Sequence, residues 1–466
     1  MISATEQLGT YLESFTEFQK RAAGRDLPWL RDLREAAFAR FCEVGFPTTH
    51  DEDWRFTNVS VIAKTPFEPA RGGEIAAKDV EAFRLPAAAC QLVFVDGHFA
   101  PSLSSTAGLP LGVRVNGLVQ EIAQNPGVLQ SHLGRYLNTQ RDPFSALNTA
   151  FAEDGAYVHI GKGVVIEAPV ALLFISTASE KPLMTHPRNL IVAEAETQAT
   201  IVEDYVSIGA SVAFCNTATE LVAGENAILS HYMIEREHRQ AFNVSTLRIQ
   251  AARSANVSSH SVLLGGGLVR NNVHPVLAGE GAECLINGLF IGNGRQHLDN
   301  YMLVEHASPH CGSRQFYNGI LDDHAHGVFH GRIIVHKEAQ KTDAKQTNRN
   351  LLLSDDARID TKPQLEIYAD DVKCTHGATI GQIEENALFY LRSRGIDEAS
   401  ARKLLLLAFA SECLDRMRPN PAREHVETLI HEHLLRLATT GHEVAQAGPP
   451  APHEPGDQGR NWEEIG

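Results

Sequence analysis

The sequence repeats one short unit four times, as VAEAETQATIVED (192–204), LVAGENAILSHY (221–232), IQAARSANVSSHS (249–261) and VLAGEGAECLING (276–288). Its marker alanines, Ala199, Ala227, Ala255 and Ala282, recur at a nearly constant interval of about 28 residues. A fixed period of this size, with strand-like runs inside each unit, indicates stacked rungs, whereas propeller blades usually need about 40 residues or more. The repeat therefore predicts a right-handed parallel β-helix.

The repeat also predicts which side chains face the interior. Side chains alternate along a strand, so the residue two positions after each alanine shares its face, and those residues are Ile201, Leu229, Val257 and Cys284. Three later segments, LDDHAHG (321–327), SDDARID (354–360) and ADDVKCTHG (369–377), resemble the unit with looser spacing. In this alignment Val372 takes the alanine position and Cys374 the interior position, although Ala357 and Val372 are separated by only about half of the repeat interval.

The periodicity divides the chain into five segments and predicts a mainly β protein with helical flanks. We expect an N-terminal helical region (1–60), a mixed α/β connecting region (61–154), the β-helix core (155–382), a C-terminal helical domain (383–440) and a disordered tail (441–466). In the helical domain, Asp397 is a candidate cap for a helix whose apolar face carries Ala401, Leu404, Leu405 and Ala408. A second helix is predicted from Asn420 and Pro421 onward.

Charge and composition limit the possible partners. The 466 residues carry a formal charge of −16, with 57 acidic residues against 41 basic ones. This sign opposes phosphate backbones and anionic lipid, so neither nucleic acid nor a membrane is an expected partner. The seven scattered cysteines and the absence of a signal-peptide pattern at the start favour reduced thiols in the cytoplasm.

Cys374 and His376 are the main candidate site residues, in YADDVKCTHGATIG (368–381). The two-residue spacing places them on one strand face, and thiolate and imidazole both suit iron–sulfur clusters and zinc. Such sites usually take four protein ligands, and no other Cys or His lies at ligand spacing nearby. The pair is either half of a metal site or ordinary buried packing.

Two other groups of residues have both a functional and a structural interpretation. The pairs Asp322–Asp323, Asp355–Asp356 and Asp370–Asp371 could supply carboxylate chemistry, but their positions favour turn formation. A second group of soft ligands comprises His306, His310, Cys311, His324, His326 and His330, for which exposed strand histidines are the commoner explanation. No G-x-S-x-G and no P-loop motif is present.

Three longer segments resemble the SufB/SufD family of the Suf iron–sulfur cluster assembly system. They are GFPTTHDEDWRFTN (45–58), the long run from Lys341 to Gly381 (KTDAKQTNRNLLLSDDARIDTKPQLEIYADDVKCTHGATIG) and LFYLRSRGI (388–396). The reading VKCTHGAT, with glycine after the histidine, is more similar to the SufD branch than to the SufB branch, which tends to have glutamate there.

The resemblance implies a β-helix core whose carboxy-terminal end pairs with SufB or with a second SufD copy. It also implies that the C-terminal helices dock the SufC ATPase, which would supply the missing P-loop. In family terms, Cys374 and His376 match positions associated with a transient cluster shared between subunits. The expected function is a non-catalytic scaffold that also assists iron acquisition. The alternatives are a β-helix carbohydrate lyase or esterase and a purely structural binding module.

Overall fold

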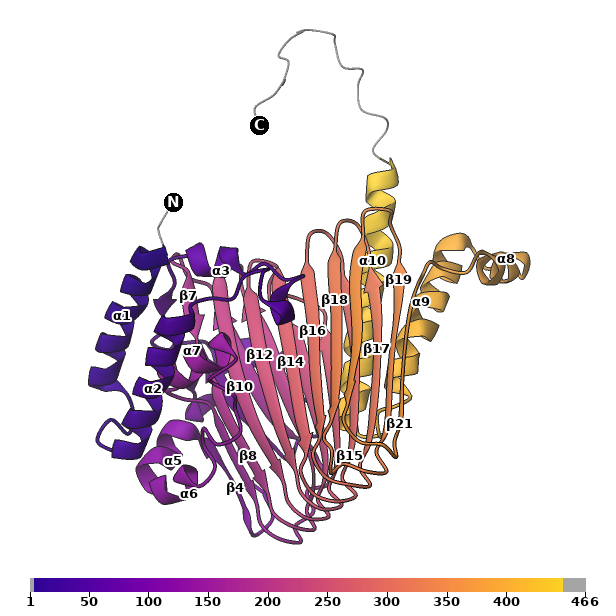
Figure 1. Cartoon of the computed structure of the whole chain (residues 1–466). Coiled ribbons are helices and arrows are strands. Elements are labelled where there is room, and N and C mark those ends of the chain that lie inside the picture. The colour runs from indigo at the N-terminus through magenta and orange to yellow at the C-terminus, as the bar shows by residue number, and fades with distance from the viewer. Residues whose placement is uncertain (1–3, 447–466) are drawn as a thin grey trace, which may run out of the picture.

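Two strands and two turns make up each repeat. In the computed structural model, which describes residues 4–446, successive strands alternate between two sheets, so each coil contributes one strand to each (Figure 1). Sheet A has the order β20-β18-β16-β14-β12-β10-β8-β5-β4, and sheet B has the order β21-β19-β17-β15-β13-β11-β9-β6-β2-β3. The coil strands pair in parallel, which confirms the predicted mainly β fold with a parallel solenoid core.

Most strands of the solenoid coils have similar lengths. In sheet A they are β5 (Ala156–Ile160), β8 (Arg188–Ala193), β10 (Ala213–Ala223), β12 (Phe242–Ala251), β14 (Leu268–Leu277), β16 (His297–His306), β18 (His326–Val335) and β20 (Arg358–Ile367). In sheet B they are β6 (Val170–Thr177), β9 (Gln198–Ile208), β11 (Ile228–Arg236), β13 (Asn256–Leu263), β15 (Glu283–Gly292), β17 (Gly312–Leu321), β19 (Asp343–Leu352) and β21 (Lys373–Gly381).

Helices and short strands flank the coils. The N-terminal elements are α1 (Ala4–Arg21), α2 (Pro28–Val44), η1 (Glu52–Trp54), α3 (Ser60–Lys64), β1 (Glu68–Pro69), α4 (Ala77–Glu81), β2 (Cys90–Val95), β3 (His98–Phe99), η2 (Pro101–Leu103), β4 (Val113–Gly117), α5 (Leu118–Gln124), α6 (Pro126–Gln130), α7 (Pro143–Phe151) and, after β6, β7 (Leu183–Thr185). The C-terminal elements are α8 (Glu385–Ser393), α9 (Glu398–Leu414) and α10 (Pro421–Gln446). Sheet A thus takes β4, and sheet B takes β2, from the segment expected to be a connecting region.

Backbone hydrogen bonds define the row of residues in which the marker alanines lie. The amide after each member donates to the carbonyl of the member one coil earlier, and the row is Thr197, Ala227, Ala255, Ala282, Cys311, Thr342 and Val372. The expected place of Ala199 in this row is wrong, because Ala199 pairs with Leu229 two positions further along the strand. An even displacement preserves the face, so the predicted inward direction still holds.

The short spacing between Ala357 and Val372 follows from the two strands per coil. Ala357 precedes β20 in sheet A and is stacked on Ala325, whereas Val372 precedes β21 in sheet B. The two residues therefore lie at opposite edges of the same coil, half a repeat apart. Val372 and Cys374 are nevertheless in phase with Ala282 and Cys284, three coils earlier.

The interior between the sheets is a continuous apolar core. Alternate residues of both sheets point into it, and Leu229, Val257, Cys284 and Ala344 are among its buried members. Each fully buried aliphatic side chain contributes about 1.5–3 kcal/mol relative to exposure, so stacking coils stabilises units that could not fold alone.

The N-terminal helices cover the outer face of sheet A near its first coils (Figure 1). Phe18, Phe38 and Phe151, from α1, α2 and α7, pack with Phe214 of β10 and Val244 of β12. This apolar cluster explains the helical spacing at the start of the sequence.

The GFPTTHDEDWRFTN segment lies against later coils of sheet A. Arg270 of β14 is fully buried, with its guanidinium 3.9 Å from the centre of the Trp54 ring and 4.8 Å from that of Tyr301. Thr57 Oγ1 donates to Asp299, the ion-pair partner of Arg270, and Glu52 forms an ion pair with Lys362 of β20. The segment therefore joins the N-terminal region to the last coil.

The C-terminal helices α9 and α10 cover the outer face of sheet B (Figure 1). Asp397 caps α9 by accepting from the Ser400 amide, as predicted, and Asn420 accepts from the Arg423 amide at the start of α10. The predicted face of α9 is wrong in part. Ala401 is buried as expected, but Leu404 and Ala408 are exposed, and the residues packed in the apolar cluster on sheet B are Leu406, Phe409, Ala410 and Cys413.

Two further expectations concern the end of the chain and membranes. Residues 441–446 continue α10, and the rest of the segment expected to be a disordered tail lies outside the described residues. Within residues 4–446, no helix has the length and apolar character needed to cross a membrane.

Candidate functional site

The solenoid ends at two strands with an unpaired edge. In the part of the chain that the structure describes, β21 pairs only with β19 and β20 pairs only with β18, so no further coil follows them. Every residue of β20 is at least partly exposed, and all of β21 except Cys374 is exposed. The interior of the solenoid is therefore accessible from this end.

Cys374 and His376 lie on β21 at this open end. Cys374 is in register with Ala344 of β19 and ends the interior row that contains Leu229, Val257, Cys284 and Ser313. Its side chain packs against the core and is half-buried. Two residues later on the same face, His376 is in register with Gln346 and is exposed.

Cys374 can face the interior and still be reached from outside, because it lies at the open end of the solenoid. Cys374 points inward as the repeat predicts, yet no coil covers it on its far side. A strand added to the edge of β21 would place its own side chains directly over Cys374 and His376. The free edge of β21 therefore leaves room for a strand from outside the chain beside the pair.

Electrostatics favour the neutral thiol in the chain by itself. Partial burial raises the pKa of the Cys374 thiol above its ordinary value, and the nearby carboxylate of Asp343 raises it further, against a lowering by the Ala344 backbone. A thiol becomes a good metal ligand only when it is deprotonated, which a bound metal ion itself favours. Binding of a metal ion by Cys374 would therefore require the thiol to lose its proton.

The described residues contain no group of three or more His, Cys, Asp or Glu side chains arranged to hold a metal ion. An iron–sulfur or zinc site usually takes four protein ligands, so a site that used Cys374 and His376 would need two more. Both interpretations of the pair, half of a metal site and ordinary packing, therefore stay predictions.

Within residues 4–446, the other histidines predicted as soft ligands do not gather into a metal site. His306 is fully buried, with Nε2 2.8 Å from Ser313 Oγ, and His330 is buried against the Tyr301 ring. His326 contacts Asp360 at 2.8 Å, and His324 lies 3.6 Å from Asp356. The expectation of exposed strand histidines is wrong for His306 and His330, whose side chains fill space inside or against the coils.

The aspartate pairs form turns at both edges of the solenoid. Asp323 adopts a positive φ of 53°, its amide donates to Asp322 Oδ1, and its own carboxylate accepts from the Gly294 amide. Asp371 at the opposite edge pairs with Lys341. Asp322–Asp323 and Asp355–Asp356 share one edge, whereas Asp370–Asp371 lies at the other, so the three pairs do not build one carboxylate groove.

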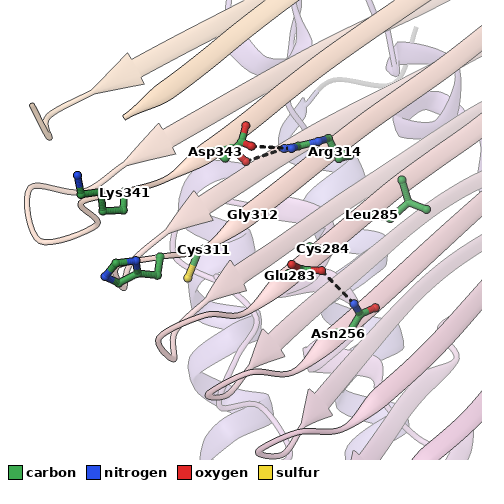
Figure 2. Close-up of a pocket in the computed structure, with 10 residues that line it drawn as sticks. Asn256, Glu283, Cys284, Leu285, Cys311, Gly312, Arg314, Lys341 and Asp343 are labelled. Carbon is green, nitrogen blue, oxygen red and sulfur yellow. Dashed lines mark hydrogen bonds and ion pairs between the residues drawn. The ribbon is translucent and has the colours of Figure 1, made fainter. Parts of the chain in front are cut away.

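A polar cavity of about 300 Å³ lies on the outer side of sheet B, where β15, β17 and β19 begin (Figure 2). Gly312 has no side chain and therefore leaves room between Glu283 and Asp343. These three residues are in register across β15, β17 and β19, and the next residue in register is Lys373 on β21, the neighbour of Cys374. Asp343 is paired with Arg314. Cys311 and Lys341 are among the residues that line this cavity (Figure 2), and Cys311 belongs to the predicted group of soft ligands.

Sequence reasoning missed the polar residues inside the last coils. Gln346 donates from Nε2 to Gln315 Oε1 at 2.8 Å, and both side chains are buried between the sheets. The signal was available, because both lie on the interior face predicted by the repeat, where an amide is unusual. Exposed Ile380 on β21 and exposed Phe389 and Tyr390 on α8 were also missed as surface features.

Comparison with known proteins places these features in a family. Residues 174–409 match the SufBD core domain of the SUF system for FeS cluster assembly, and residues 5–172 match the SufBD protein N-terminal region. An iron–sulfur cluster assembly SufBD family protein of Synechocystis is 35% identical over 408 residues, covering 86% of this chain and 90% of the relative.

Two further relatives support the same assignment. The iron–sulfur cluster assembly protein SufD of Escherichia coli is 33% identical, over 84% of this chain and 90% of that protein. A chloroplastic Arabidopsis thaliana protein, ABCI7, is 29% identical over 90% of each chain. The resemblance of the sequence motifs is thus confirmed, and the chain belongs to the SufBD family of iron–sulfur cluster assembly proteins.

Proposed function

We propose that this chain is a non-catalytic scaffold subunit on which nascent iron–sulfur clusters are assembled together with a partner subunit. The cluster is cargo that Cys374 and His376 hold transiently, and the partner supplies the remaining ligands. The partner is SufB or a second copy of this chain, and the energy comes from a SufC-type ATPase. Assistance in iron acquisition belongs to the same proposal and follows from the family resemblance.

The observation that carries the proposal is the position of Cys374 and His376 on an unpaired edge strand. An exposed edge with apolar side chains favours pairing with another chain, and natural proteins normally block such edges. Here Ile367, Tyr368 and Ile380 are exposed beside the open interior. A partner solenoid added edge to edge would cover them and bring its own ligands to the same place.

The helix α8 supports the docking of an ATPase. It extends away from the solenoid beyond α9 (Figure 1), and its side chains Phe389 and Tyr390 are exposed. Leu404 on α9, which the sequence pattern assigned to the buried face, is also exposed. Exposed aromatic residues on a projecting helix are typical of binding hot spots.

A cytoplasmic location is part of the proposal. All seven cysteines are free, which suits a reducing compartment, and thiol ligands for a nascent cluster must remain reduced. The chloroplastic relative shows that the compartment differs among similar proteins.

The test is the iron and sulfide content of the complex purified after co-expression with SufB and SufC partners. We expect Cys374→Ala and His376→Ala each to lower both contents several-fold. Cys42→Ala is the matched control, because Cys42 is the other half-buried free cysteine and lies on α2. Losing one small side chain from a long stack costs about 1 kcal/mol, so the variants should fold.

Each outcome separates the candidate functions. If both contents are unchanged in the two variants, the chain is a structural module with inert thiols and the proposal is wrong. Depolymerisation of an acidic polysaccharide by the purified chain would favour the lyase alternative, against which the turn geometry of Asp322–Asp323 counts. Equal loss in Cys42→Ala would indicate a general effect on stability.

A further inference from the structure

Two glutamines form a short amide ladder that stops one coil before His376. Gln315 of β17 and Gln346 of β19 are in register, neither has more than 2% of its surface exposed, and Gln346 Nε2 donates to Gln315 Oε1 at 2.8 Å. The next position in this row, on β21, is His376. The row therefore leads from the interior of the solenoid directly to a candidate ligand.

The ladder leaves one acceptor unused. Gln346 Oε1 is buried and has no hydrogen-bond partner in the structure. An unpaired buried carbonyl costs roughly 1–3 kcal/mol, so such a group in a native protein needs an explanation. Gly331 opposite contributes to the placement, because any side chain there would collide with the Gln346 amide.

The direction of the ladder indicates where this acceptor points. In a ladder of amides along parallel strands, each side chain donates to one neighbour and accepts from the neighbour on the other side. Gln346 donates toward the earlier coil, so its free oxygen faces the later one. In-register residues on adjacent strands are about 4.8 Å apart, within reach of a histidine side chain.

We propose that Gln346 is a positioning residue whose Oε1 accepts the ring N–H of His376. This inference rests on the proposed function, in which His376 is a ligand. A neutral imidazole has one N–H and one bare nitrogen, so fixing the N–H on Gln346 leaves the bare nitrogen free to bind metal. His376 is exposed and in register with Gln346, and the bond requires its ring to turn toward the interior.

A hydrogen bond from His376 to Gln346 would prepare the histidine ring for metal binding. Metal-binding histidines almost always donate their other ring N–H to a carbonyl, carboxylate or water, and losing that partner typically lowers metal affinity 10- to 100-fold. Gln346 would select one tautomer and hold the ring across the open end. The remaining nitrogen would then face the position where an added strand brings further ligands.

The first measurement reports the tautomer of His376 in the full chain, without any cluster. Histidine is labelled with ¹⁵N and two-bond ¹H–¹⁵N correlations are recorded near pH 8, where an ordinary imidazole is neutral. Signals of His376 are those lost in His376→Gln. We expect the wild-type chain to show one dominant tautomer and Gln346→Leu to show an averaged mixture.

Two further variants keep the test specific. Gln346→Glu retains an acceptor, and Gln315 can rotate its unpaired Nε2 to donate to it, so the wild-type tautomer should be restored. Asn348→Leu is the matched control, because Asn348 is a buried amide on the same face of the same strand but in register with Ala378. An identical His376 pattern in wild type and Gln346→Leu overturns the inference, as does a mixture in Asn348→Leu equal to that in Gln346→Leu.

Cluster content of the co-expressed complex separates this inference from the proposed function. We expect Gln346→Leu to lower iron content roughly tenfold and Gln346→Glu to recover most of it. If His376→Ala lowers the content but Gln346→Leu leaves both content and tautomer unchanged, the inference fails and the function stands. If the tautomer depends on Gln346 but His376→Ala has full content, the function fails while the Gln346–His376 bond stands.

Discussion

Phe389 is the most exposed aromatic side chain on the helix that projects from the solenoid, with 73% of its surface in solvent. The neighbouring Tyr390 differs, because the Arg394 guanidinium lies 5.2 Å from its ring centre and donates to its hydroxyl. Tyr390 thus has a partner inside the chain, whereas the Phe389 ring is available for a partner outside it.

We expect Phe389→Ala to weaken binding of the purified ATPase partner about 30-fold, because removing an aromatic anchor of an interface typically costs about 2 kcal/mol or more. Titration calorimetry or surface plasmon resonance with purified components measures the change. Leu12→Ala is the control, since Leu12 is also an exposed apolar helical residue, with 54% of its surface in solvent, but lies on α1. Unchanged affinity in Phe389→Ala would exclude the α8 surface from the contact.

The strand β21 has the alternating sequence pattern of a strand with one buried face. It lies, however, at the free edge of its sheet, where that face is largely exposed. Cys374, His376 and Ile380 alternate with residues of the outer face, yet Ile380 keeps 52% of its surface exposed. An exposed edge strand with apolar side chains is a template for pairing with another chain.

Ile380→Asp should therefore abolish stable pairing at the open end. A charge placed among side chains that become buried costs several kcal/mol on association, which is enough to dissociate a micromolar complex. Size-exclusion chromatography with light scattering of the co-expressed subunits provides the measurement. The matched control is Leu111→Asp, because Leu111 is 97% exposed and precedes β4 at the other end of the fold. A complex that survives Ile380→Asp would place the interface elsewhere.

The period and the alternation of side chains were sufficient to predict the solenoid and the inward direction of Cys374. The sequence pattern could not reveal that each coil has one strand in each of two sheets. The turns at the two edges differ in length, so the interval from one strand to the next is not constant, as the spacing of Ala357 and Val372 shows. Apolar spacing on α9 predicted a face of which Ala401 is buried but Leu404 and Ala408 are exposed. The helix is apolar on most sides, and contact with sheet B selected Phe409 and Cys413. His306 and His330 were unpredictable as buried residues, because hydrogen bonds and ring contacts from other coils satisfy them.

At the scale of the whole molecule, buried histidines make stability depend on pH. Burial lowers the pKa of His186 and His260 to about 3 and of His297, His306 and His433 to about 4. These residues are neutral in the folded chain, whereas the unfolded chain protonates them below about pH 6.5. Their contribution to stability is therefore complete above pH 6.5 and is lost as the pH falls toward 4.

We expect the free energy of unfolding to decrease steadily from pH 7 to pH 4.5 in urea titrations. Buried Glu235 and Glu237, whose pKa values are raised by burial, act in the opposite direction and reduce the net slope. His306→Gln isolates one group and should flatten the slope by up to about 1.4 kcal/mol per pH unit. Identical slopes for the variant and the wild type would show that His306 does not titrate on unfolding.

The variable turns of the solenoid have a consequence for how this protein can change over time. Ala255 and Ala282 are closer together in the sequence than Cys311 and Thr342 are, yet each pair is joined by the same kind of backbone hydrogen bond. Insertions and deletions at the coil edges are thus absorbed locally and do not rotate or shift the terminal rung. The turns at the coil edges can therefore change in length during evolution, while the number of whole coils before Cys374 sets the distance between the two ends of the molecule.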